Sequence, residues 1–87
     1  MTIQYELIKR TIAGEHFLVP VGEGAQRFKG MFALNELGAF LWDHIPLVKD
    51  EEELVERVLQ EYEVDQATAR QDTKEFLASL REMGILK

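Results

Sequence analysis

The sequence contains no cysteine, and this absence excludes several chemistries at once. Disulfide scaffolds, thiolate metal sites, iron–sulfur ligation and cysteine nucleophiles all require the missing side chain. No apolar run approaches the roughly 20 residues that a membrane-spanning helix needs. The N-terminus shows no basic segment followed by an apolar one, so no signal peptide is predicted. We therefore expect a cytoplasmic protein without a membrane segment and, from its 87 residues, a single domain over residues 1–87.

The chain is also poor in side chains that perform catalysis. Its candidates are His16, His44 and Ser79, which lie far apart in the sequence with no pattern that brings them together. Three consecutive acids at 51–53 cannot converge on a metal, because successive helical residues point about 100° apart. The glycines between Gly22 and Gly30 lead into a strand and lack the Lys-Ser/Thr ending of a phosphate-binding loop. No enzyme activity, metal or cofactor is predicted.

The charge is acidic overall and unevenly placed. The net charge is −6, and residues 43–65 hold nine acids against two bases. The segments on either side are close to neutral. A phosphate backbone would be repelled by the middle of the chain and only weakly attracted by its ends, so a nucleic-acid partner is not expected.

The first third of the chain has the pattern of strands. Alternating apolar residues predict an antiparallel hairpin over Ile3–Val21, with a tight turn at Ala13–Gly14. Glycine-rich residues 22–30 predict a loop without regular structure. The short run Met31–Leu34 predicts a third strand, and because it is apolar on both faces we expect both faces to be covered.

Three helices are predicted in the rest of the chain. The first begins at the N-cap Asn35 and runs to Pro46, and the second begins at Asp50 with an apolar stripe that reaches Tyr62. The third begins at Asp65 and ends before Gly84, after which Ile85-Leu86 is expected to fold back over the helix end.

Three strands followed by three helices predict an α+β fold with a winged-helix-like shape. A three-stranded antiparallel sheet cannot bury both of its faces alone, so the helices must cover one. The third strand follows a loop and is a candidate edge strand. The unpaired N–H and C=O groups of such an edge could accept a foreign strand, or the same strand of a second copy in a homodimer.

Residues 34–42, with the sequence LNELGAFLW, resemble the LN-x-x-(G/A)-A-x-x-W signature of PqqD-like proteins, which are also called RiPP recognition elements. (RiPP denotes a ribosomally made, post-translationally modified peptide.) The resemblance continues through the spacing of Ala69, Asp72 and Phe76 and ends at Gly84-Ile85-Leu86. It covers nearly the whole chain as an ordered set of motifs.

This resemblance implies a non-catalytic adaptor that binds the leader segment of a precursor peptide. The domain would present the leader to a modifying enzyme, such as a radical-SAM protein, a cyclodehydratase or a leader peptidase. The leader would add a strand in a cleft between the third strand and the third helix. By the family's layout the strand side is Lys29, Gly30, Met31, Phe32 and Ala33.

The helix side of this cleft is assigned from helical phase. Phe76, Leu80 and Met83 are expected to face the core. The neighbouring flank would then line the cleft, and its three bases could pair with acids of the leader. That flank consists of Arg70, Thr73, Lys74, Leu77 and Arg81.

A winged-helix DNA-binding regulator is the alternative from a different functional class. In that reading the third helix would enter the major groove, and its bases are the feature that favours it. The net charge of −6, the acidic second helix and a wing loop with only Arg27 and Lys29 stand against it.

Overall fold

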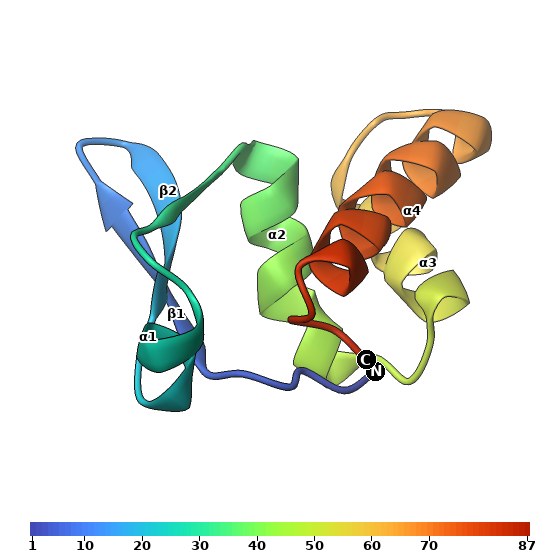
Figure 1. Ribbon diagram of the computed structural model, residues 1–87. Coiled ribbons are helices and arrows are strands. Elements are labelled where there is room, and N and C mark those ends of the chain that lie inside the picture. Colours follow the sequence, from blue (N-terminus) through green and yellow to red (C-terminus); the bar gives the residue numbers. More distant parts are fainter.

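The computed structural model describes residues 1–87 as a small sheet with the short helix α1 on one side of the molecule and the longer helices on the other (Figure 1). The sheet is antiparallel with the order β1-β2-β3. This arrangement confirms the predicted α+β fold with a three-stranded sheet. In chain order the elements are β1 (Leu7–Ile12), β2 (Glu15–Pro20), α1 (Glu23–Arg27), β3 (Phe32–Leu34), α2 (Glu36–His44), the 3₁₀ turn η1 (Ile45–Leu47), α3 (Glu51–Glu61) and α4 (Gln66–Glu82).

The β1–β2 hairpin turns at the predicted dipeptide. Ala13 and Gly14 have φ angles of 52° and 81°, as a two-residue hairpin turn requires. The strand begins at Leu7 instead of Ile3, because the residues before it pair with the other end of the chain. Ile3 forms a bridge with Leu86, so the two termini lie side by side (Figure 1).

The segment predicted as a loop contains a short helix, α1, so that prediction is wrong for Glu23–Arg27. Gly22 makes the turn into this helix with a φ of 57°. Gly24 is buried, and a Cβ atom added there would lie 2.5 Å from the carbonyl oxygen of Glu6. Gly22 therefore allows the sharp turn into α1, and Gly24 allows the helix to lie close to the Glu6 backbone. The sequence pattern alone did not distinguish these glycines from glycines in a loop.

The three long helices begin at the predicted caps. Asn35, Asp50 and Asp65 each accept a hydrogen bond from the backbone N–H three residues later, over 2.7, 2.9 and 2.7 Å. Helix α2 ends at His44, slightly before Pro46, which lies in the 3₁₀ turn. At the end of α4, Gly84 has the expected positive φ of 78°.

Helix α2 lies between the sheet and the pair α3–α4 (Figure 1). One buried cluster joins these layers and includes Leu18 of β2, Leu41 of α2, Leu54 of α3 and Leu77 of α4. The predicted return of the C-terminus is confirmed, because Ile85 and Leu86 are buried in the same cluster. The helices therefore cover one face of the sheet.

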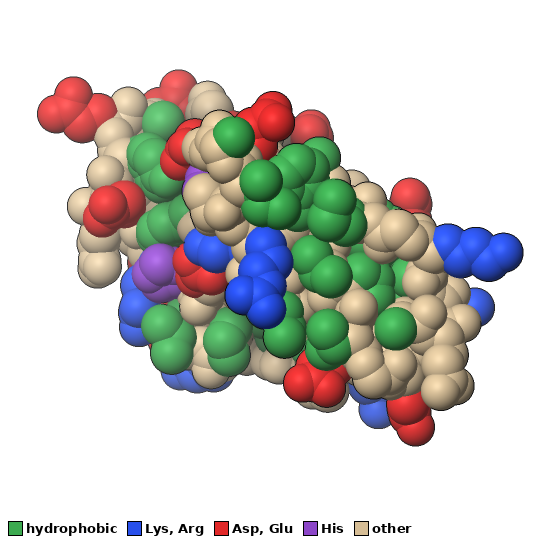
Figure 2. Space-filling model, turned by 90° about the vertical axis from the view of Figure 1, so that its left-hand side faces the viewer, with side chains coloured by type: hydrophobic (Ala, Val, Ile, Leu, Met, Phe, Trp, Pro, Cys, Tyr) green, Lys and Arg blue, Asp and Glu red, His purple; other side chains and the backbone are tan.

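The other face of the sheet is open, so the expectation that β3 is covered on both faces is wrong. Figure 2 views the molecule from the hairpin side, where hydrophobic side chains reach the surface. Among the exposed apolar residues are Ile8 and Ile12, with exposed fractions of 39% and 55%, and Met31 with 54%. A short apolar run thus indicates a strand but does not indicate that both faces are buried.

The close approach at Gly24 gives a first prediction. A Gly24→Ala substitution forces its new methyl group against the Glu6 backbone, which cannot rotate away. We expect a loss of about 1–3 kcal/mol in the free energy of unfolding, measured by urea denaturation, as for other overpacked sites. Ala25→Gly, at an exposed position of the same helix, controls for helix propensity. An alanine variant as stable as the parent protein would contradict the close approach.

Candidate functional site

Strand β3 forms one edge of the sheet. It pairs through Phe32, Ala33 and Leu34 with β2, and no strand lies on its other side. An edge of this kind presents backbone N–H and C=O groups that a further strand can use. Beside it stands α4, and the space between the two elements is hollow.

The first part of this hollow is an apolar chamber of about 240 Å³ between β3 and the C-terminal half of α4. Its walls come mainly from aliphatic and aromatic side chains, with Leu18 of β2 among them. Strand β3 supplies Phe32, Ala33 and Leu34 to this chamber, while α4 supplies Phe76, Ser79, Leu80 and Met83.

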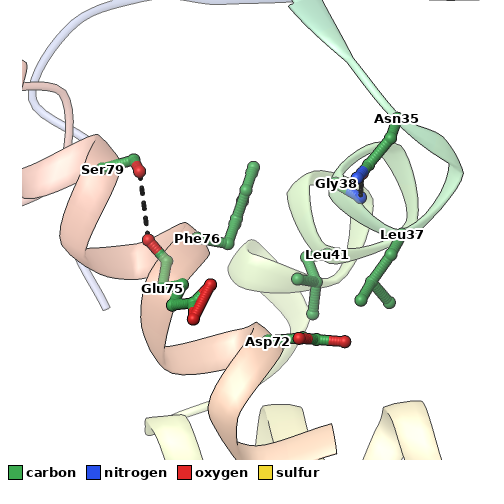
Figure 3. Close-up of a pocket in the computed structure, with 8 residues that line it drawn as sticks. All are labelled: Asn35, Leu37, Gly38, Leu41, Asp72, Glu75, Phe76 and Ser79. Carbon is green, nitrogen blue, oxygen red and sulfur yellow. Dashed lines mark hydrogen bonds between the residues drawn. The ribbon is translucent and has the colours of Figure 1, made fainter. Parts of the chain in front are cut away.

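The second part is a more polar chamber of about 280 Å³ between the N-terminal end of α2 and α4 (Figure 3). The carboxylates of Asp72 and Glu75 line it, together with Leu37 and Leu41. The two chambers lie next to each other, because Asn35, Gly38, Phe76 and Ser79 line both. We call the two chambers together the β3–α4 groove.

Gly38 sets the width of the groove where the chambers meet. A Cβ atom on this residue would lie 3.1 Å from Asn35 Oδ1 and 3.3 Å from the Phe76 ring. The glycine lets the first turn of α2 approach that ring, which stands between α2 and α4 in Figure 3. At the same turn, the Gly38 N–H donates to Asn35 Oδ1 over 2.7 Å. The N-cap of α2 and the wall of the groove therefore both depend on Asn35 and Gly38.

The predicted strand residues lie on two sides of the sheet edge. Phe32 and Ala33 line the groove, as expected. Lys29, Gly30 and Met31 instead line a separate, open hollow of about 430 Å³ beside α1. The structure therefore brings only part of the predicted strand side to the groove.

The predicted helical phase of α4 is wrong for the residues that it placed in the cleft, whereas Leu80 is buried in the core as expected and Phe76 and Met83 pack against that core. Thr73 and Leu77 are 0% exposed and belong to the interior, so they do not line the groove. Lys74 and Arg81 are exposed but lie off the groove lining. Arg70 turns toward α3 and forms an ion pair with Glu52. None of the five predicted α4 residues lines either chamber of the groove.

The residues that do face the groove follow one helical stripe. Asp72, Phe76, Ser79 and Met83 are spaced by three or four positions, which places them on one side of α4. Helical spacing predicted Phe76 to face the core with Leu80 and Met83; Phe76 does pack against the core but also lines the groove, and Asp72 and Ser79 were missed as lining residues. Asp72 and Ser79 could have been found from the helical spacing of Asp72, Phe76, Ser79 and Met83, a stripe of polar and apolar residues that lies next to the buried stripe of α4.

The ion pair of Arg70 with Glu52 ties α3 to α4. Arg70 Nη1 and Nη2 donate to the two Glu52 carboxylate oxygens over 2.5 and 3.0 Å. These hydrogen bonds hold the pKa of the Glu52 carboxyl below its usual value and raise the pKa of the Arg70 guanidinium. The positive charge that was predicted to face a ligand therefore serves to join two helices.

The lining of the groove combines main-chain, apolar and acidic groups. Its lining offers an unpaired strand edge, an apolar chamber and two carboxylates, while neither histidine of the chain lines it. No group of three or more histidine or acidic side chains is arranged to hold a metal ion. None of the helices is both long enough and apolar enough to span a bilayer.

A winged-helix-like α+β domain with an open sheet edge beside its last helix is a class of binding domain. Comparison with known families then identifies the group within that class. The family described as "Coenzyme PQQ synthesis protein D (PqqD)" matches residues 15–86, and the chain belongs to this family. The predicted resemblance is confirmed.

A solved structure supports the same grouping. It is described as "TbiB1 in Complex with the TbiA(beta) Leader Peptide" and is similar over 100% of this chain and 95% of that chain. The TM-score is 0.75 and the sequence identity is 28%. A search of curated protein sequences found no match.

The phase of α4 can be tested by truncating two adjacent side chains. Leu77→Ala removes a fully buried side chain, and we expect a loss of about 2–5 kcal/mol in the free energy of unfolding. Phe76→Ala removes a ring that is only half-buried in the groove, and we expect a smaller loss of about 1–2 kcal/mol. Urea denaturation of both variants measures the difference. The reverse order of stability would restore the phase predicted from the sequence.

The Glu52–Arg70 pair predicts a dependence of stability on pH. Because the folded-state pKa of Glu52 is lowered, the pair stabilises the protein above the ordinary glutamate pKa, and this contribution is lost as the pH falls through the lowered value. Glu52→Gln should therefore lose less stability than the parent between pH 7 and pH 3, measured by urea denaturation. Glu56→Gln, at an exposed position of the same helix, should behave like the parent. An equal acid response in all three proteins would refute the prediction.

Proposed function

We propose that this protein is a non-catalytic adaptor that binds the leader segment of a ribosomally made precursor peptide and presents it to a modifying enzyme. The leader lies in the β3–α4 groove and adds a strand to β3. The observation that carries this proposal is the open edge of β3 beside a chamber lined by Phe32, Leu34 and Leu80. A strand edge and an apolar cleft together are what an extended peptide requires.

In strand addition, different groups of the peptide provide the affinity and the specificity of binding. Main-chain hydrogen bonds to β3 bind a peptide largely without regard to its sequence. Side chains on alternate positions of the peptide point to the same side, and these would enter the chambers of the groove. The leader is thereby chosen by a few of its residues.

The comparisons support the proposal without identifying the peptide. The TbiB1 structure is described as a complex with a leader peptide, and it matches this chain over its whole length. On that basis we propose that this chain also binds a leader peptide. We propose further that residues 1–87 form one peptide-recognition domain. Presentation of the leader to a modifying enzyme and a cytoplasmic location stay predictions.

The DNA-binding alternative has no structural support. A recognition helix needs bases directed at phosphates or base edges. On α4, Arg70 is engaged by Glu52, and the exposed bases Lys74 and Arg81 are interspersed along the helix with the exposed acids Asp72, Glu75 and Glu82. Helix α4 therefore presents no continuous basic surface to a duplex.

Binding can be tested with synthetic N-terminal segments of the short precursor peptides encoded beside the gene. We expect one of them, labelled with fluorescein, to bind with a dissociation constant of roughly micromolar or tighter by fluorescence anisotropy. Amide shifts in ¹H–¹⁵N spectra should centre on residues 32–34 and on the groove stripe of α4. Methylating single backbone nitrogens of the peptide should weaken binding at every second position, because only alternate amides face β3.

Two substitutions on adjacent residues of α4 serve as variant and control. Ser79→Arg places a bulky side chain where the two chambers meet and should weaken binding at least tenfold. Ala78→Arg adds the same side chain at an exposed position off the groove and should leave binding unchanged. Peptides that bind equally to both variants, or shifts confined to the open sheet face, would refute the proposed groove.

A further inference from the structure

The α2 end of the β3–α4 groove carries charge of one sign. Asp72 and Glu75 line it from α4, and both are exposed. Glu75 Oε1 accepts a hydrogen bond from Gln71 Nε2 over 2.8 Å, but none of the three ion pairs in the structure includes either carboxylate. The groove therefore contains two acids that no base of the protein neutralises.

Other charges nearby do not offset these acids. Lys74 follows Asp72 by two positions, which turns it about 200° around the helix and away from the groove. The N-terminal end of α2 contributes a positive potential equivalent to about half a charge. The carboxylate of Glu36 in the first turn of α2 opposes this potential, and Glu36 lines a further hollow of about 210 Å³ together with Asp72. Glu36 is itself paired with His16 over 3.3 Å. The potential at this end is negative.

The apolar and acidic parts of the groove lie a short distance apart along α4. On α4 the apolar chamber is lined by residues between 76 and 83 and the acidic chamber by residues between 72 and 79, so their centres lie about four residues, or roughly 6 Å, apart along the helix. An extended peptide covers that distance in roughly two residues, and it covers the roughly 12 Å from the carboxylates at 72–75 to the apolar side chains at 80–83 in roughly four. Because side chains two or four positions apart point to the same side of a strand, one peptide can place a side chain in each chamber.

We infer that the leader recognised by this protein carries an apolar residue and, two or four positions away, a lysine or arginine that lies against Asp72 and Glu75. This inference rests on the proposed function and specifies its substrate. It reverses the expectation from the sequence, in which bases of the last helix would meet leader acids. The apolar residue fills the chamber beside β3, and the base selects among peptides that could otherwise add to the same edge.

Selection from a display library of random 12-residue peptides tests the inference without knowledge of the natural leader. The immobilised protein should enrich peptides in which lysine or arginine stands two or four positions from a leucine, isoleucine, valine or phenylalanine. Enriched peptides with acidic residues at those positions, or with no charge preference there, would overturn the inference.

A double-mutant cycle then assigns the base to its partner. We expect Asp72→Asn/Glu75→Gln to weaken an enriched peptide three- to tenfold, the range of a partly covered ion pair, and added NaCl to reduce the difference. Replacing the base of the peptide by glutamine should cost the same factor in the parent protein and nothing further in the double variant. Glu56→Gln/Glu61→Gln removes two exposed acids from α3 and should leave binding unchanged. Additive losses in the cycle would overturn the inference.

Failure of the inference and failure of the proposed function give different results. Peptides that lose affinity on backbone methylation and on Ser79→Arg, but show no preference for a base, overturn the inference and leave strand addition intact. If no peptide is enriched, or if enriched peptides tolerate both changes, the proposed function itself is overturned.

Discussion

The unsatisfied backbone edge of β3 is the constraint on which the functional structure depends. A free strand edge invites pairing with any extended chain, and proteins usually limit this by shortening the strand or covering it. Here β3 has only three residues and stands beside α4, so an incoming strand must enter a groove instead of meeting a flat edge. Access is thereby restricted to a narrow, extended partner with suitable side chains.

One face of helix α4 packs in the core, and the neighbouring face lines the groove. Ala69, Thr73, Leu77 and Leu80 are buried and fix the helix to the core. The neighbouring stripe, with Phe76 at its centre, faces the groove. Because the buried stripe holds the helix in place, the groove stripe can tolerate polar residues such as Asp72 and Ser79. Most side chains of α4 therefore contribute either to the core or to the groove, and Leu80 and Phe76 contribute to both.

Acidic side chains occupy two different kinds of position in the structure. Glu52 on α3 engages Arg70 and joins the last two helices. Asp72 and Glu75 on α4 remain unpaired in the groove. The net charge of −6 disfavours a phosphate backbone, but only the positions of individual carboxylates bear on the charge of a peptide that would lie in the groove.

Local patterns along the chain predicted the elements well, because caps, turns and apolar periodicity act over a few residues. Asn35, Asp50 and Asp65 mark the starts of the long helices, and Ala13–Gly14 marks the hairpin turn. Motifs spread over the chain also indicated the family. The helix at Glu23–Arg27 was missed because the close packing of Gly24 on Glu6 is a long-range contact.

By itself, then, the sequence determined the hairpin, the third strand, the three long helices with their caps, and the family, but not the short helix α1. The tertiary structure decided which face of α4 is buried, and with it which residues line the groove. That choice depends on how α4 packs against α2 and α3, and the two faces differ by a rotation of one residue about the helix axis. Apolar content along a single helix does not distinguish a core stripe from a groove stripe, since Phe76 and Leu77 are both apolar and only their neighbours in space separate them.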